Sequence, residues 1–98
     1  LSLAKEVARW HHEKWDGSGY PDSLSGDAIP VSARLMALAD VFDALISHRV
    51  YKDAMSYHEA RNIIADARGQ HFDPDVADIF LTHFDDFVAI AERHRDAG

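Results

Sequence analysis

Two adjacent histidines followed by a glutamate, His11-His12-Glu13, are the residues whose types and spacing best suit metal chemistry. They lie directly before a glycine-rich run over residues 17–21. A further carboxylate, Asp40, falls within an otherwise apolar helical pattern. A carboxylate in an apolar helix is costly unless a cation or hydrogen-bond donors meet it. The two stretches explain each other if both contribute ligands to one metal centre.

The residue types available as ligands limit which metals the site could bind. Cysteine is absent from the sequence, which excludes thiolate ligands, and imidazole with carboxylate suits iron, manganese or zinc. Two such ions about 3.5–4 Å apart form a common centre for cleaving a phosphodiester. Arg49 and Lys52 follow the helix that contains Asp40, and two cations there would suit the oxygens of a phosphate.

Each of these residues also has a structural interpretation. Asp40 could be a hydrogen-bonded core residue paired with Arg34 or with a backbone donor, and Asp43 could bridge to the basic residues beyond its helix. Those basic residues could be ordinary solvated charges. Glu13 is equally compatible with a supporting position behind the ligands and with an exposed one. The remaining histidines lack ligand spacing and are interpreted as structural or exposed: His48, His58, His71, His83 and His94.

Helical periodicity predicts an all-α fold, a bundle of about four helices with a long ordered loop. The first helix is expected from Ser2 to about Trp15, with both histidines in its last turn, about 100° apart around the axis. A loop rich in glycine and proline follows over residues 17–30. The second helix is expected to begin at Pro30. Its apolar residues point in almost every direction, so we expect it to be buried on all sides.

Capping signals mark the later helices. Residues 56–59 form a capping box for the third helix, and Gly69 is a stop signal. Asp73-Pro74 supplies an N-cap with proline at the first helical position. One continuous helix is expected from there to the polar end over residues 92–98, and no strand of useful length is expected.

The composition of the chain limits which kinds of partner it is expected to bind and where in the cell it is expected to lie. Ten basic residues against 17 acidic ones give a formal net charge of -7, which argues against duplex nucleic acid or an anionic membrane as a general partner. No apolar run approaches the roughly 18–20 residues that span a bilayer, and no signal peptide is recognisable, so we expect a cytoplasmic protein. The helical pattern is already under way at Leu1, which suggests a piece of a longer protein.

The motifs resemble the HD-GYP domain, a group within the HD phosphohydrolase superfamily. The residues that carry the resemblance are the run 11–21, Ile29-Pro30, Ala33-Arg34, the run 39–45, Arg49, Tyr51-Lys52, Gly69 and Phe72-Asp73-Pro74. The resemblance covers nearly the whole chain and identifies residues 1–98 as the C-terminal portion of such a domain. It implies an all-helical fold, hydrolysis of the bacterial second messenger cyclic di-GMP, and two or three divalent metal ions, often iron or manganese.

Carried over residue by residue, the resemblance implies three metal ligands: His11, His12 and Asp40. It implies that Arg49 and Lys52 approach the substrate phosphates. Tyr20 would lie on the loop beside the site, where the family uses it for contacts with a ligand or a partner. Three positions depart from the common pattern without touching a proposed ligand: Ser23, Ile46 and Val50.

The His-Asp pair that names the superfamily is missing, because no His-Asp dipeptide occurs in this sequence. The lysine that follows that pair and further histidine ligands would also have to come from residues before Leu1. A centre with only three of its ligands would bind metal weakly or not at all. We therefore expect the chain alone to be inactive, although the protein it belongs to is, or descends from, a phosphodiesterase.

Two function classes stay open. One is the metal-dependent enzyme. The other is a degenerate binding module whose loop over residues 17–30 docks a partner such as a diguanylate cyclase domain. The chain offers few helices to cover the helix that begins at Pro30, so we also expect a homo-oligomer in which two copies cover each other.

Overall fold

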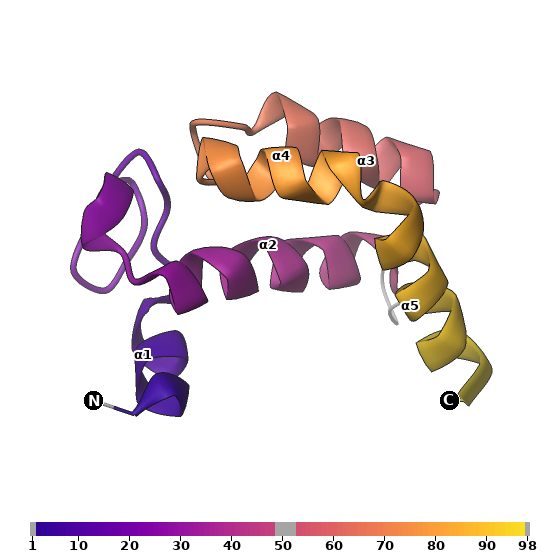
Figure 1. Ribbon diagram of the computed structural model, residues 1–98, viewed down its shortest axis with the longest axis horizontal. Helices are drawn as coiled ribbons and strands as arrows, with labels where there is room; N and C mark the ends of the chain where they lie inside the picture. Colours follow the sequence, from indigo (N-terminus) through magenta and orange to yellow (C-terminus); the bar gives the residue numbers. More distant parts are fainter. Residues whose placement is uncertain (1, 49–52, 98) are drawn as a thin grey trace.

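The computed structural model describes residues 2–48 and 53–97, in which five α-helices and one short 3-10 helix replace the expected four helices. Their bounds are α1 Leu3–Trp10, η1 Gly26–Ala28, α2 Val31–Ile46, α3 Tyr57–Asp66, α4 Pro74–Thr82 and α5 Phe84–Ala97 (Figure 1). Within the described residues the fold is all-helical, as predicted, with only an isolated bridge between Arg68 and Phe72. Arg49 and Lys52 lie outside the described residues.

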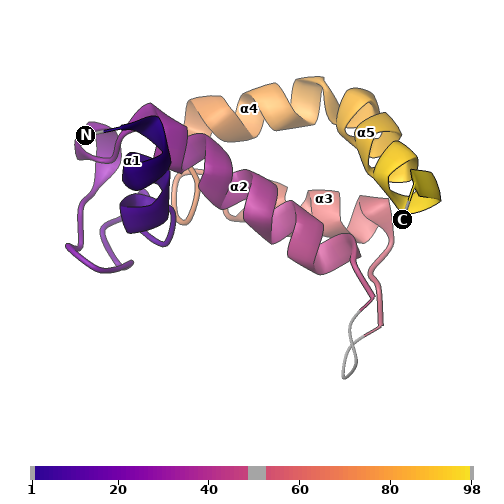
Figure 2. The same cartoon turned by 90° about the horizontal axis from the view of Figure 1, so that it is seen from below.

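The core forms where α2 lies along the pair of helices α3 and α4, with α1 and α5 near opposite ends of α2 (Figure 2). Phe80 of α4 is 1% exposed. Its ring centroid lies 5.1 Å from that of Phe42 on α2 and 5.0 Å from that of Phe87 on α5. These edge-on contacts are the favoured geometry for aromatic rings and join three helices.

The predicted starts of the helices are confirmed. The Ser56 hydroxyl accepts a hydrogen bond from the Glu59 N–H and donates one to the Glu59 carboxylate, each at 3.1 Å. Asp73 is the N-cap of α4, which begins at Pro74, and its carboxylate accepts a hydrogen bond from the Asp75 N–H at 2.8 Å. These local signals depend on neighbouring residues only, which is why the sequence reveals them.

The single helix expected after Asp73 is wrong, because the chain turns at His83, where φ is -106° and ψ is 24°. Neither glycine nor proline marks this turn in the sequence. The turn is stabilised by packing of aromatic rings: the ring centroids of Phe84 and Phe87 lie 5.8 Å and 5.0 Å from that of Phe80. Residues 80 and 87 would lie about 10.5 Å apart along the axis of a straight helix, so the turn is what brings the Phe87 ring close to Phe80.

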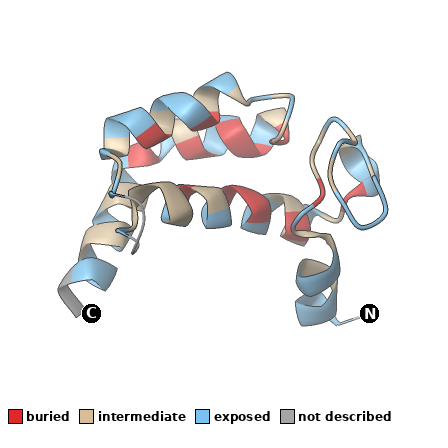
Figure 3. Ribbon diagram, turned by 180° about the vertical axis from the view of Figure 1, so that it is seen from behind, coloured by how far each residue is buried: buried red, intermediate tan, exposed pale blue. Residues whose placement is uncertain are grey.

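The expectation that α2 is buried on all sides is also wrong for the described chain. Buried positions gather between α2 and the α3–α4 pair (Figure 3). Other positions of α2 stay exposed: Val31 is 57% exposed, Leu35 48% and Met36 38%. Of the described helices, α3 and α4 cover one side of α2 and α1 packs near its beginning (Figure 1), so the cover is incomplete. None of its helices combines the length and apolar character needed to cross a bilayer.

Candidate metal centre

His11 ends α1 with its imidazole orientation fixed by the helix. Its Nδ1 lies 2.7 Å from the backbone oxygen of Val7. A carbonyl oxygen can only accept, so Nδ1 carries the proton and Nε2 keeps its lone pair in the neutral ring. This is the usual arrangement of a metal-binding histidine, whose second nitrogen donates to a carbonyl or carboxylate.

Asp40 on α2 faces that free nitrogen. Its Oδ2 lies 3.9 Å from His11 Nε2, too far for a hydrogen bond but within the span of two metal–ligand bonds of about 2.1 Å each. The Asp40 side chain is 54% exposed, so the expectation of a buried carboxylate is wrong. A groove between α1 and α2 adjoins both groups and is lined by Leu3, Ala4, Val7, Ala8, His11, Met36 and Asp40.

His12 lies beside His11 but outside the helix. The two ring centroids are 3.9 Å apart and the rings are inclined by 41°. Because α1 ends at Trp10 rather than near Trp15, the prediction that both histidines occupy a helical turn is wrong. Within the described residues no three potential ligand side chains converge on one point. The structure thus brings His11 to Asp40 and His12 to His11, but does not bring these three together as one cluster.

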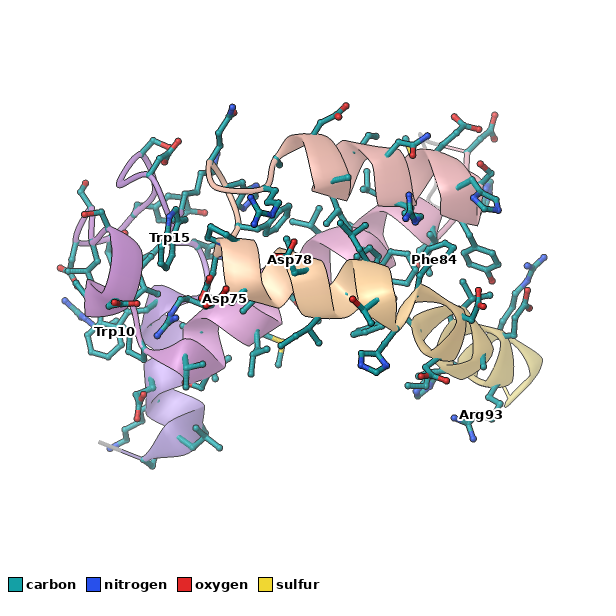
Figure 4. The ribbon with its side chains drawn as sticks, turned by 45° about the horizontal axis from the view of Figure 1, so that its top comes forward. Trp10, Trp15, Asp75, Asp78, Phe84 and Arg93 are labelled. Carbon is teal, nitrogen blue, oxygen red and sulfur yellow. The ribbon has the colours of Figure 1, made fainter. Side chains whose placement is uncertain are left out.

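The early end of α1 has a long-range cause. The backbone N–H groups of Trp15 and Asp16 donate to the carbonyls of His71 and Gln70, at 3.0 Å and 2.9 Å. These bonds to the segment before α4 replace the helical ones, and the chain then folds into the loop over residues 17–30. Trp10 and Trp15 both lie at this end of the molecule (Figure 4). Sequence reasoning could not find partners so distant along the chain.

Tyr20 projects from the loop onto the histidine pair. Its side chain is exposed, at 61%, and its ring stacks on that of His12, with centroids 4.9 Å apart and an angle of 19°. The peptide bond between Tyr20 and Pro21 is cis. The stacking places the Tyr20 ring beside His12, one of the candidate ligands.

Arg34 does not pair with Asp40. Its Nη1 donates to the Asp73 carboxylate at 2.6 Å and its Nε to the Ile29 carbonyl at 2.8 Å. Its guanidinium also lies 5.9 Å from the centre of the Trp15 ring. The structural interpretation of Asp40 therefore loses one of its two proposed partners, and Arg34 instead joins α2 to the loop and to the start of α4.

From the sequence alone, the role of Glu13 stayed undecided and Asp22 was not identified as part of this site. Glu13 is buried, at 2% exposure, and accepts backbone hydrogen bonds from the loop. Asp22 accepts from the side chains of Arg9 and Trp10. The only signal for Glu13 was its place directly before a glycine-rich loop. Asp22 has no such signal, because its partners are recognisable only once the loop is folded.

Replacing Gly19 by alanine is expected to disrupt this loop. An added Cβ would lie 2.5 Å from the His12 oxygen and the Lys14 nitrogen, both backbone atoms that cannot move aside cheaply. We expect the free energy of unfolding to fall by about 3 kcal/mol, the upper part of the range for overpacking. Gly26→Ala is the matched control, because its added Cβ meets open space. Only the left-handed backbone at this position is then unfavourable, and it lowers the free energy of unfolding by about 1 kcal/mol. Equal urea midpoints for the two variants would contradict the steric account.

His71 makes stability sensitive to acid. Burial, followed by the positive charge of Lys14, lowers the pKa of His71 below its ordinary value of 6.5. The unfolded chain therefore takes up this proton first as pH falls, so stability is lost below about pH 6.5 and is unaffected above it. We expect His71→Asn to flatten the fall in unfolding free energy on the acid side. Parallel curves for the two proteins from pH 7 to pH 5 would count against this assignment.

The sequence of the chain is similar to a known protein family and to several known proteins. A family model described as an HD domain matches residues 1–76. A probable cyclic di-GMP phosphodiesterase of Vibrio cholerae is 60% identical over 96 residues, covering 98% of this chain and 22% of the relative. A second relative from that organism, a cyclic di-GMP phosphodiesterase, is 60% identical over 97 residues, covering 99% of this chain and 20% of the relative.

A third relative from the same organism is named a 3'3'-cGAMP-specific phosphodiesterase and is 50% identical over 90 residues, covering 92% of this chain and 17% of the relative. The chain thus spans about a fifth of the length of these relatives. All three are named as phosphodiesterases of cyclic dinucleotides. These names agree with the resemblance that the motifs carry.

Proposed function

Because the chain belongs to the HD domain family, we propose that it is part of a metal-dependent phosphodiesterase that hydrolyses cyclic di-GMP. The observation that carries the proposal is the pairing of His11 and Asp40, in which a proton-bearing Nδ1 leaves Nε2 free at 3.9 Å from a carboxylate oxygen. The names of the relatives support the substrate. We call the longer cytoplasmic protein that would contain this chain the complete protein.

The donor set fits a divalent metal. His11, His12 and Asp40 would be ligands of the ions in the complete protein, not all three of one ion, and they offer imidazole nitrogen and carboxylate oxygen, which suit iron or manganese. Such a metal, when bound, supplies Lewis acidity and lowers the pKa of a bound water. We propose two or three ions in the complete protein, with the remaining ligands supplied from outside these residues.

The chain's own residues would orient the ligand and the substrate. The Val7 carbonyl holds His11 in one tautomer, and Tyr20 covers one side of His12. Arg49 and Lys52 are proposed to contact the substrate phosphates, because a guanidinium and an ammonium provide charge-assisted hydrogen bonds to phosphate oxygens. The exposed ring of Tyr20 is also proposed to contact the substrate.

The test compares the chain with the complete protein. The complete protein, loaded with manganese or iron, is expected to convert cyclic di-GMP to a linear dinucleotide. The 98-residue chain under the same conditions is expected to give no product. Turnover by the chain alone, or none by the complete protein, would contradict the proposal.

A second candidate is a binding module, favoured by the 61% exposure of Tyr20 on the loop over residues 17–30. That loop would dock a diguanylate cyclase domain while catalysis is lost. The sequence of the complete protein separates the two candidates. An intact His-Asp pair with its further histidines favours the enzyme, and replacement of those residues favours the module.

The exposed apolar residues of α2 lead to a prediction about assembly. Val31, Leu35 and Met36 expose apolar surface that a second copy of the chain could cover. We therefore expect the isolated 98-residue chain to form a dimer, measured by light scattering as a doubled mass. A well-folded monomer at the same concentration would contradict this expectation.

A further inference from the structure

Glu13 is buried although it directly follows the two candidate ligand histidines. Its side chain is 2% exposed, and its carboxylate oxygens accept from the backbone N–H groups of Asp22 at 2.7 Å and Leu24 at 2.9 Å. Hydrogen bonds to an ionised acceptor are stronger than neutral ones, and two of them fix a direction as well as a distance. Glu13 therefore anchors the turn after Tyr20 to the segment that follows α1.

A second set of contacts reaches the same turn from outside. The Asp22 carboxylate accepts from Arg9 Nε and Nη2, each at 3.1 Å, and from Trp10 Nε1 at 2.8 Å. These contacts are exposed to water, which weakens them. Since the bonds to Glu13 are less exposed, Glu13 is the principal anchor of the turn.

The anchored turn carries Tyr20 across His12. The Tyr20 N–H donates to the His12 carbonyl at 3.3 Å, and the two rings stack with centroids 4.9 Å apart. The His12 ring also lies 3.9 Å from that of His11. An imidazole in contact with two other rings has few orientations open to it.

We infer that Glu13 is a positioning residue, which holds Tyr20 on His12 through the loop and so fixes the direction in which His12 presents its ring nitrogens. The consequence for catalysis rests on the proposed function, whereas the link between Glu13 and the stacked rings does not. Residues that support metal ligands in this way typically change metal affinity or activity by 10–100-fold when replaced.

The first test is nuclear magnetic resonance on the 98-residue chain carrying Glu13→Gln. The amide keeps the shape of the side chain but turns one accepting oxygen into an NH2 group that faces an N–H donor. We expect loss of the nuclear Overhauser contact between the Tyr20 and His12 rings and of the upfield shift of the His12 ring protons. The matched control Glu6→Gln, on α1, is expected to keep both. Their persistence in Glu13→Gln would overturn the inference.

The second test covers the case in which Glu13→Gln does not fold. Tyr20 is exposed, so Tyr20→Leu removes the stack without opening the core. In the complete protein we expect the manganese needed for half-maximal rate to rise about 10-fold, because His12 is no longer held in one orientation. KM is expected to rise as well, through the proposed substrate contact of Tyr20. A manganese requirement equal to that of the wild type would overturn the inference. If the complete protein hydrolyses nothing, the proposed function fails, while the ring contact still decides the role of Glu13.

Discussion

Replacing Arg34 by alanine is expected to lower the free energy of unfolding by about 3 kcal/mol, because it leaves a buried carboxylate without its cation. Asp73 is 4% exposed, and its side chain accepts from Arg34 at 2.6 Å. The substitution also removes a donor from the Ile29 carbonyl. Since these contacts join α2, the loop and the start of α4, the urea midpoint of the whole domain should fall in a single transition.

A matched control is available in Arg68, whose guanidinium donates to the Asp78 carboxylate at 2.8 Å and 3.0 Å. Both side chains are about half exposed, at 48% and 51%, so water replaces much of what Arg68→Ala removes. We expect that variant to unfold close to the wild type. If Arg34→Ala costs no more than Arg68→Ala, burial does not distinguish the two ion pairs and the account of Arg34 is wrong.

Replacing His11 by alanine is expected to lower the rate of cyclic di-GMP hydrolysis by the complete protein at least about 100-fold, because a ligand contributes more than its supporting residues do. Asp40→Ala should have an effect of the same order. The metal bound per protein should fall in both variants, measured by elemental analysis. These side chains are partly exposed, so neither change should alter the core.

The control for this prediction is His94→Ala, which removes an exposed imidazole from α5, at the other end of the molecule. It is expected to leave both rate and metal content unchanged. A rate in His11→Ala within a few-fold of the wild type would show that His11 does not hold the reacting centre. Equal losses in all three variants would point to a general effect of the substitutions.

The parts of the fold that the sequence predicts are those set by neighbouring residues. The capping box at Ser56, the N-cap at Asp73 and the start of α2 after Pro30 are examples. The turn at His83 could not be predicted, because it serves contacts between aromatic rings and carries no glycine or proline. The incomplete burial of α2 depends on which helices cover it, a property of the assembled fold.

The candidate site divides in the same way. Histidine and carboxylate types indicated metal chemistry, and the structure brings His11 Nε2 to 3.9 Å from Asp40. The pairing of Arg34 with Asp73 could not be predicted, because Asp73 is far along the chain. The role of Glu13 was left undecided, since backbone N–H groups of a folded loop have no signature in the sequence.

In this account the imidazole of His11, at the end of α1, and the carboxylate of Asp40, on α2, hold a common metal. The most direct measurement is anomalous X-ray scattering from crystals of the complete protein containing manganese, collected at the manganese absorption edge. The account predicts a peak within about 2.3 Å of both His11 Nε2 and an Asp40 oxygen. Peaks elsewhere in the protein, with His11 and Asp40 bound only to water or to each other, would contradict it.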